Sequence, residues 1–268
     1  MFDQKAFIIK IFSMMILYTS APAATSNLYL QKADSLYAYR AEGFQPASGL
    51  VDTSNINRAI RCYQKSLNLA DSTMKEKIYW KIMQCFYYKG NYTLNDKKKR
   101  KQCFRQGIDI GNRALEMYPN SPGLHFWMGI LWGYWSEQVG LLTAGRKGVA
   151  GKVRHHAESL IAIQDTFAEG GAYRTLGRLH FMAPKIPLIL GWPSKKKALR
   201  YFEKAFSINH ENLFTKQYYA EALYDQGEKK QAIQMMKEIL DSDKTVHGIA
   251  EDAFIKKEAE KFLNEHPE

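Results

Sequence analysis

The amino-acid sequence predicts an all-α fold, a solenoid of helical hairpins. Apolar residues recur at helical spacing from about Leu28 to the C-terminus, and no run alternates as a half-buried strand would. The clearest helix pair is Asn212–Leu240, where the turn residues 225–227 interrupt the pattern. Small side chains at Ala220 and Ala232, on either side of this turn, would let the two helices approach closely.

The same phase of apolar and small residues recurs along the chain, which indicates internal repetition. We expect five helix pairs and one closing helix, at Asn27–Asp71, Ser72–Tyr118, Ser121–Phe167, Gly170–Asn209, His210–Asp241 and Ile249–Asn264. This spacing is typical of tetratricopeptide repeats, which are helix pairs of roughly 34 residues. The closing helix is mostly charged, as expected of a cap at the end of a stack.

Small residues are expected where the helices of a tetratricopeptide stack cross, because a larger side chain would hold the backbones apart. The positions predicted to pack the repeats are Ala59, Ala114, Gly129, Gly177, Ala198, Ala205, Ala220 and Ala232. First helices of successive pairs would then line the concave face of the superhelix.

The N-terminus has the features of a secretory signal peptide. Lys5 and Lys10 precede an apolar run, and Ala21-Pro22-Ala23 would suit cleavage. We therefore expect residues 1–23 to be a cleaved signal or an uncleaved anchor, followed by a single tetratricopeptide-like domain over 24–268. The expected location is periplasmic or otherwise exported. No cysteine stands near the cleavage site to carry a lipid anchor.

The chain is basic, with 38 Lys and Arg against 27 Asp and Glu and a net charge of +11. Such a charge suits acidic partners or peripheral association with an anionic membrane, although solubility alone is the plainer interpretation. The basic runs Lys97–Lys101 and Lys195–Lys197 could contact phosphates, but in an exported protein we expect no nucleic-acid partner. Cys62, Cys85 and Cys103 fall within helical patterns, which predicts buried thiols.

No catalytic, cofactor-binding or metal-binding motif is complete. Gly145–Val153 has neither the glycine spacing nor the hydroxyl of a phosphate-binding loop. His155 and His156 are adjacent, so they cannot share a helix face, and neither has a partner at the spacing of zinc ligands. We therefore expect no enzyme activity, no cofactor and no metal. A glycan-cleaving enzyme would need a general-acid carboxylate in a cleft, for which no local motif exists.

The segment Ser121–Gly227 resembles a known family. Its stretches SPGLHFWMGILWGYW, YRTLGRLHFMAP and LGWPSKKKAL are similar to the TatT-like T component of tripartite ATP-independent periplasmic (TRAP) transporters. They are also similar to the animal regulators of microtubule dynamics, which share these divergent repeats. The resemblance implies a non-enzymatic binding protein with a largely apolar lumen. Its implied partner is another protein, such as a periplasmic solute-binding protein.

The aromatic helix Gly123–Gly140 could be core or the wall of an apolar lumen. On the resemblance, the positions expected to line a lumen for a ligand or partner are Trp132, Trp135, Tyr173, Arg174, His180 and Trp192. Replacing either Trp132 or Trp135 by alanine would then weaken binding more than stability. The proline-rich insert Phe181–Ser194 is expected to be an enlarged turn that packs over the mouth of the stack, with gating as a hypothesis.

Two settings follow from these features. The first is an exported scaffold that binds a solute-binding protein of a TRAP-type system or a hydrophobic small ligand, with homo-oligomers allowed. The alternative is an intracellular adaptor resembling the regulators of microtubule dynamics and held to a membrane by its N-terminus.

Overall fold

The computed structural model describes residues 23–184, 191–243 and 245–267, and the predicted all-α fold is confirmed there. A helix over residues 23–38 comes first. The others are α2 (Ser54–Leu69), α3 (Ser72–Tyr92), α4 (Lys97–Met117), α5 (Pro122–Val139), α6 (Leu141–Arg146), α7 (Val149–Gln164), α8 (Phe167–Met182), α9 (Lys195–Ile208), α10 (Leu213–Asp225), α11 (Lys229–Leu240) and α12 (Ile249–Glu265). All but the last residue of the predicted signal or anchor at 1–23 lie outside the described residues.

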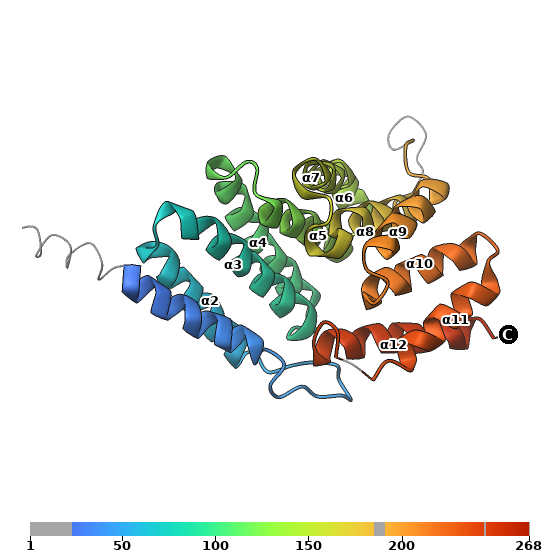
Figure 1. The fold of residues 1–268 in the computed structure, drawn as a ribbon, viewed down its shortest axis with the longest axis horizontal. Helices are drawn as coiled ribbons and strands as arrows, with labels where there is room; N and C mark the ends of the chain where they lie inside the picture. The colour runs from blue at the N-terminus through green and yellow to red at the C-terminus, as the bar shows by residue number, and fades with distance from the viewer. Residues whose placement is uncertain (1–22, 185–190, 244, 268) are drawn as a thin grey trace, which may run out of the picture.

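The helices form the expected pairs, and each pair packs on the next. The pairs are the N-terminal helix with α2, α3 with α4, α5 with α7, α8 with α9, and α10 with α11, while the short α6 joins α5 to α7. Figure 1 shows the pairs following one another along a strongly curved path, which ends in α12.

Short polar side chains mark where many of these helices begin. Asp71, Asp96, Ser121, Ser194 and Asn212 each accept a hydrogen bond from a backbone N–H in the first turn of the helix that follows. Such caps satisfy donors that have no partner within the helix. The Ser194 cap fixes the start of α9 directly after the proline-rich insert.

The repeat-packing positions are all buried in the helix interfaces. Their members are Ala59, Ala114, Gly129, Gly177, Ala198, Ala205, Ala220 and Ala232. Gly177 gives the tightest approach between α8 and α9, since a Cβ atom placed there would lie 2.5 Å from the ring of Phe202. Cys62, Cys85 and Cys103 are free and buried, as predicted.

The last helix returns to the first pair, so the solenoid closes into a ring. The Arg40 guanidinium, just after the N-terminal helix, bonds the Glu251 carboxylate at 2.8 Å and the carbonyl of His247 at 2.7 Å. The Tyr92 and Phe254 rings meet edge to face 6.3 Å apart. The expected closing helix therefore packs on α10 and α11, and its first residues contact the loop after the N-terminal helix and the end of α3 (Figure 1).

Candidate functional site: the concave face

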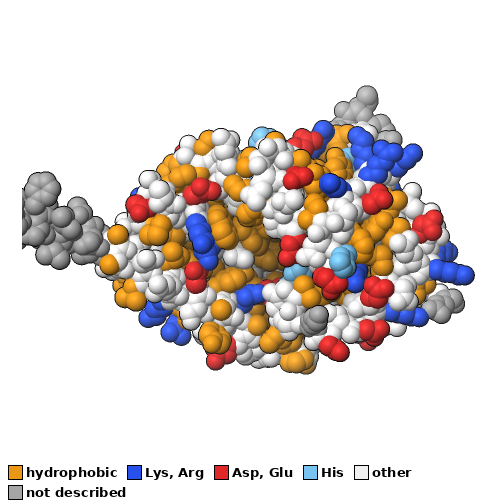
Figure 2. All heavy atoms as spheres, viewed as in Figure 1, with side chains coloured by type: hydrophobic (Ala, Val, Ile, Leu, Met, Phe, Trp, Pro, Cys, Tyr) orange, Lys and Arg blue, Asp and Glu red, His pale blue; other side chains and the backbone are white. Residues whose placement is uncertain are grey.

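The first helices of the pairs lie on the inside of the ring. Helix α3 packs on α5, α5 on α8, and α8 on α10, whereas the second helices α4, α7, α9 and α11 make no comparable contacts with one another. Because the first helices are closer together, the stack curves with them on its concave side. Figure 2 shows a hollow in the middle of this face, with hydrophobic side chains inside it.

Half-buried tyrosines converge on this hollow from different helices. The rings of Tyr87 on α3 and Tyr134 on α5 lie 5.3 Å apart, and Tyr87 Oη and Tyr92 Oη are 3.3 Å apart. Tyr218 on α10 acts electrostatically on both Tyr87 and Tyr134. Burial raises the pKa values of Tyr87, Tyr134 and Tyr218 above the ordinary value of 10.0. Their hydroxyls therefore stay neutral and can donate hydrogen bonds.

Two arginines of α8 provide the polar part of the same surface. Arg178 forms an ion pair with Glu221 of α10, and its guanidinium lies 4.4 Å from the centre of the Tyr218 ring. Arg174 donates from Nη1 to Thr215 Oγ1 at 3.0 Å and forms no ion pair with a carboxylate of the described residues. Burial lowers the pKa of Arg174 below its ordinary value, but a guanidinium starts so far above neutral pH that it remains charged.

A left-handed turn at the start of α8 holds Arg174 in place. Ala168, Glu169 and Gly170 have φ angles of 49°, 57° and 72°, a conformation that costs energy at the two residues with a Cβ. Hydrogen bonds from Arg174 and Asn212 offset part of this cost. Arg174 makes longer bonds of 3.4 and 3.5 Å to the carbonyls of Ala168 and Glu169, and Asn212 Nδ2 donates to Glu169 Oε2 at 2.6 Å.

Comparison with known sequences agrees with this architecture. The sequence profile of a family described as regulator of microtubule dynamics protein 1-3 matches residues 44–266. The chain belongs to this family. The resemblance to the regulators of microtubule dynamics is thus confirmed, while the finer resemblance to TatT-like T components stays a prediction. No curated protein sequence matches the chain.

Solved structures support the fold of this family member. A thermophilic tetratricopeptide protein of Thermus thermophilus superposes with a TM-score of 0.60 at 11% identity, covering 89% of this chain and 99% of its own. At that identity the likeness concerns the fold alone. Two MamA structures, each 15% identical, give TM-scores of 0.45 and 0.46. They cover 78% and 91% of this chain, and 93% and 96% of their own, and are too distant for a detailed comparison.

Trp132 and Trp135 lie in the core of this repeat stack, which corrects their expected place in the lumen. They are 4% and 5% exposed, and their rings meet 5.5 Å apart on the side of α5 that faces α4 and α7. Lys152 of α7 covers Trp132 at 4.1 Å. Aromatic residues surround α5, so the pattern could not tell which of them turn inward; Tyr134 does.

Tyr173, His180 and Trp192 form a second aromatic cluster, on the side of α8 that packs against α7 and α9. The His180 ring stacks on Tyr201 at 5.5 Å and meets Trp192 at 5.1 Å, while Tyr173 stacks on Tyr201 at 6.4 Å. Arg154 of α7 lies 5.0 Å from the Trp192 ring. Of the six expected lumen residues, only Arg174 faces the hollow.

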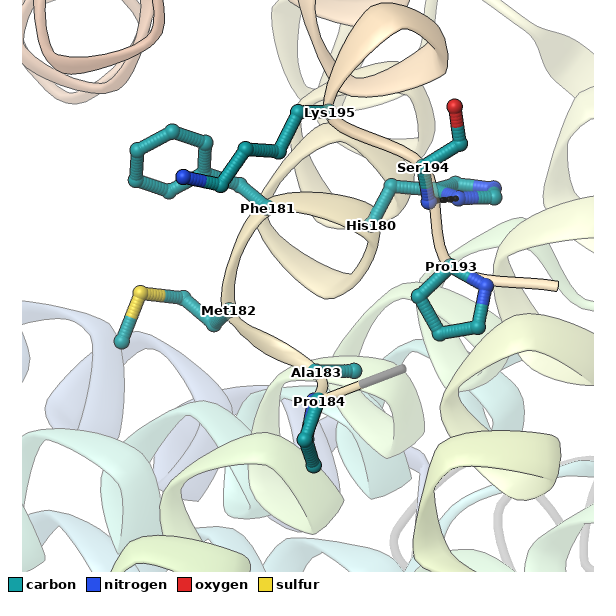
Figure 3. Close-up of a pocket in the computed structure, with 8 residues that line it drawn as sticks. All are labelled: His180, Phe181, Met182, Ala183, Pro184, Pro193, Ser194 and Lys195. Carbon is teal, nitrogen blue, oxygen red and sulfur yellow. Dashed lines mark hydrogen bonds between the residues drawn. The ribbon is translucent and has the colours of Figure 1, made fainter. Parts of the chain in front are cut away.

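The proline-rich insert begins and ends in a surface pocket of about 510 Å³ between α8 and α9. Phe181 and Lys195 extend to one side of it, with Lys195 Nζ 5.5 Å from the Phe181 ring, and His180 turns to the other side beside Ser194 (Figure 3). Trp192 packs on His180 and under Arg154 of α7, so the described end of the insert lies at the junction of α7, α8 and α9 and not, as expected from the sequence, over the mouth of the stack. The apolar residues Ile186, Leu188 and Leu190 lie outside the described residues.

One sequence signal could have identified the inward positions. Arg178 and Glu221, which pair across the concave face, each follow the small packing residue of their helix, Gly177 and Ala220. Arg174 stands one turn before Arg178. On the first helices α8 and α10, the residue after the small packing position therefore points inward, and so does Arg174, one turn away.

The described residues hold no group of three His, Cys, Asp or Glu side chains arranged to bind a metal ion. Within the same residues, every helix is too short or too polar to span a bilayer.

Proposed function

We propose that this protein is a non-enzymatic adaptor whose concave face binds an extended segment of a partner protein. The observation that carries the proposal is the convergence of Tyr87, Tyr134 and Tyr218 with Arg174 and Arg178 from helices far apart in the sequence. Tyrosine and arginine dominate the energetics of protein interfaces because they offer large rigid contact areas together with hydrogen-bond donors.

An extended polypeptide fits this surface better than a purely hydrophobic small ligand. The tyrosine rings supply apolar contacts, but the ion pair of Arg178 with Glu221 and the charge on Arg174 would be desolvated by an apolar molecule without compensation. A peptide supplies backbone carbonyls and N–H groups at short intervals, which can satisfy these polar groups.

The family match supports the adaptor setting over the exported one. It covers residues 44–266, whereas export rests on the sequence of residues 1–23 and the TRAP-type partner on the resemblance of a shorter segment. N-terminal sequencing of the protein from its native host tests the choice: an intact Met1 supports the anchored adaptor, and a mature chain starting near Ala24 supports export.

Binding is tested by selecting ligands from a display library of random linear peptides and measuring their affinity by fluorescence anisotropy. Tyr134→Ser and Tyr218→Ser should each weaken binding by about thirtyfold, the equivalent of roughly 2 kcal/mol for a central interface residue. Tyr201→Ser, in the aromatic cluster around His180, should leave the affinity unchanged. Equal losses in all three variants, or selected peptides that bind the Tyr218 variant normally, would contradict the proposal.

A further inference from the structure

We infer that Arg174 binds a carboxylate of the partner segment that occupies the concave face; this inference rests on the proposed function. The two arginines of α8 differ in their partners. Arg178 is neutralised by Glu221, but Arg174 has a hydroxyl and two backbone carbonyls as its partners. A guanidinium offers five N–H donors, so donors remain for a ligand.

The carboxylate nearest in the sequence does not take this role. Glu169 acts electrostatically on Arg174, but its Oε2 accepts from Asn212 at 2.6 Å, and the left-handed turn fixes its backbone. Arg174 therefore keeps a net positive charge that faces the hollow. Paired guanidinium and carboxylate groups form strong hydrogen bonds in such partly desolvated places.

The surroundings favour a single negative charge. Tyr87, Tyr134 and Tyr218 lie within electrostatic range of Arg174, and as neutral phenols they can donate to an oxyanion without adding charge. A phosphate carries close to two negative charges at neutral pH. One of them would remain uncompensated beside Glu221 and Glu169, so an Asp or Glu side chain or a C-terminal carboxylate fits better.

The test uses the peptides selected on the full chain. Wild-type protein should enrich one acidic position, and changing that residue to its amide should weaken binding by at least about tenfold, as expected for a charge-assisted hydrogen bond. Arg174→Gln should bind the acidic and amide peptides equally. Arg174→Lys keeps the charge and should retain part of the preference. Arg154→Gln, from an exposed ion pair with Glu158 on α7, is the matched control and should retain all of it.

Each outcome bears on one proposal or on both. If peptides are selected without an acidic position, or if Arg174→Gln still prefers the acid over the amide, Arg174 does not bind a carboxylate and the adaptor proposal stands. Stronger competition by inorganic phosphate than by acetate at equal ionic strength would also overturn the carboxylate assignment. If no peptide is selected at all, both proposals fail. Thermal unfolding of each variant shows whether the left-handed turn still folds.

Discussion

Arg40 and Glu251 lie 211 residues apart in the chain, and Arg40 Nε and Nη2 both donate to one carboxylate oxygen, Glu251 Oε1, at 3.0 and 2.8 Å. Both side chains are largely buried, at 15% and 7% exposure. Burial raises the pKa of Glu251, and the charge on Arg40 opposes that rise. This contact joins the two ends of the solenoid, together with the Tyr92–Phe254 ring contact.

Arg40→Met should lower the free energy of unfolding by about 3–5 kcal/mol, because it leaves the Glu251 carboxylate buried and unpaired. Urea unfolding measures this loss. In this variant, hydrogen exchange should show that the amides of α12 lose protection first, because Arg40 holds the start of α12 against the N-terminal part of the chain. The matched control is Arg105→Met, from an exposed pair with Asp109, which should cost less than about 1 kcal/mol. Equal losses of unfolding free energy in the two variants would show that the buried Arg40–Glu251 pair does not stabilise the closed ring.

A buried histidine pair should make stability fall in mild acid. Burial lowers the pKa of His125 and lowers that of His156 from 6.5 to about 3, so both rings are neutral in the fold near pH 7. With His125 neutral and its Nε2 donating to the carbonyl of Pro119 at 2.8 Å, its Nδ1 accepts from His156 Nδ1 at 3.1 Å.

The unfolded chain protonates His156 near pH 6.5 and the folded chain only near pH 3. The contribution of His156 to stability is thus fully present above pH 6.5 and is lost as the pH falls toward 3, by up to about 1.4 kcal/mol per pH unit, and the lowered pKa of His125 acts in the same direction. Unfolding midpoints of wild type and His156→Gln, compared at several pH values, should diverge most at neutral pH. Parallel curves would show that His156 does not keep a lowered pKa.

Gly177 and Gly133 give a test of the repeat packing. A Cβ at Gly177 would meet the fully buried Phe202 ring at 2.5 Å, so Gly177→Ala should destabilise the protein by about 1–3 kcal/mol. At Gly133, also inside a helix, a Cβ would have no atom of the described residues within 4 Å apart from its chain neighbours and its own helix backbone. There the same change should be neutral or stabilise by up to about 1 kcal/mol, from helix propensity alone. Thermal unfolding in the same buffer distinguishes the two outcomes.

Substitutions at Trp135 distinguish the contribution of side-chain volume to stability from the contribution of the indole N–H. Its Nε1 is buried and has no hydrogen-bond partner within residues 23–184, 191–243 and 245–267. Trp135→Phe removes that unsatisfied donor and should change stability little, whereas Trp135→Ala should cost about 3–5 kcal/mol through the cavity it leaves. Peptide binding by the folded Phe variant should be unaffected. A marked loss of peptide affinity in the Trp135→Phe variant would show that Trp135 belongs to the binding surface.

The fold could be predicted from sequence because its helix pairs depend on local signals. Ala220 and Ala232 occupy the helix-packing positions on either side of a turn that contains a glycine. Ser194 follows a proline and caps the next helix. Both patterns involve residues close together in the sequence. The ring closure could not be found this way, since Arg40 and Glu251 meet only after the curvature of every repeat has accumulated. The lumen was misassigned because α5 carries aromatic residues on all sides. The position of a residue relative to Gly177 or Ala220 would have predicted better than aromatic character whether its side chain points toward the concave face. By this criterion Arg178 and Glu221 point inward.

The central claim is that the partner segment lies along the first helices. Photo-cross-linking tests it most directly, with a benzophenone amino acid placed at position 218 on the concave face or at position 201 in the aromatic cluster around His180, in the presence of a selected peptide. We predict cross-links from position 218 and none from position 201. Cross-links from position 201 alone would place the binding surface at the junction of α7, α8 and α9 and contradict the account.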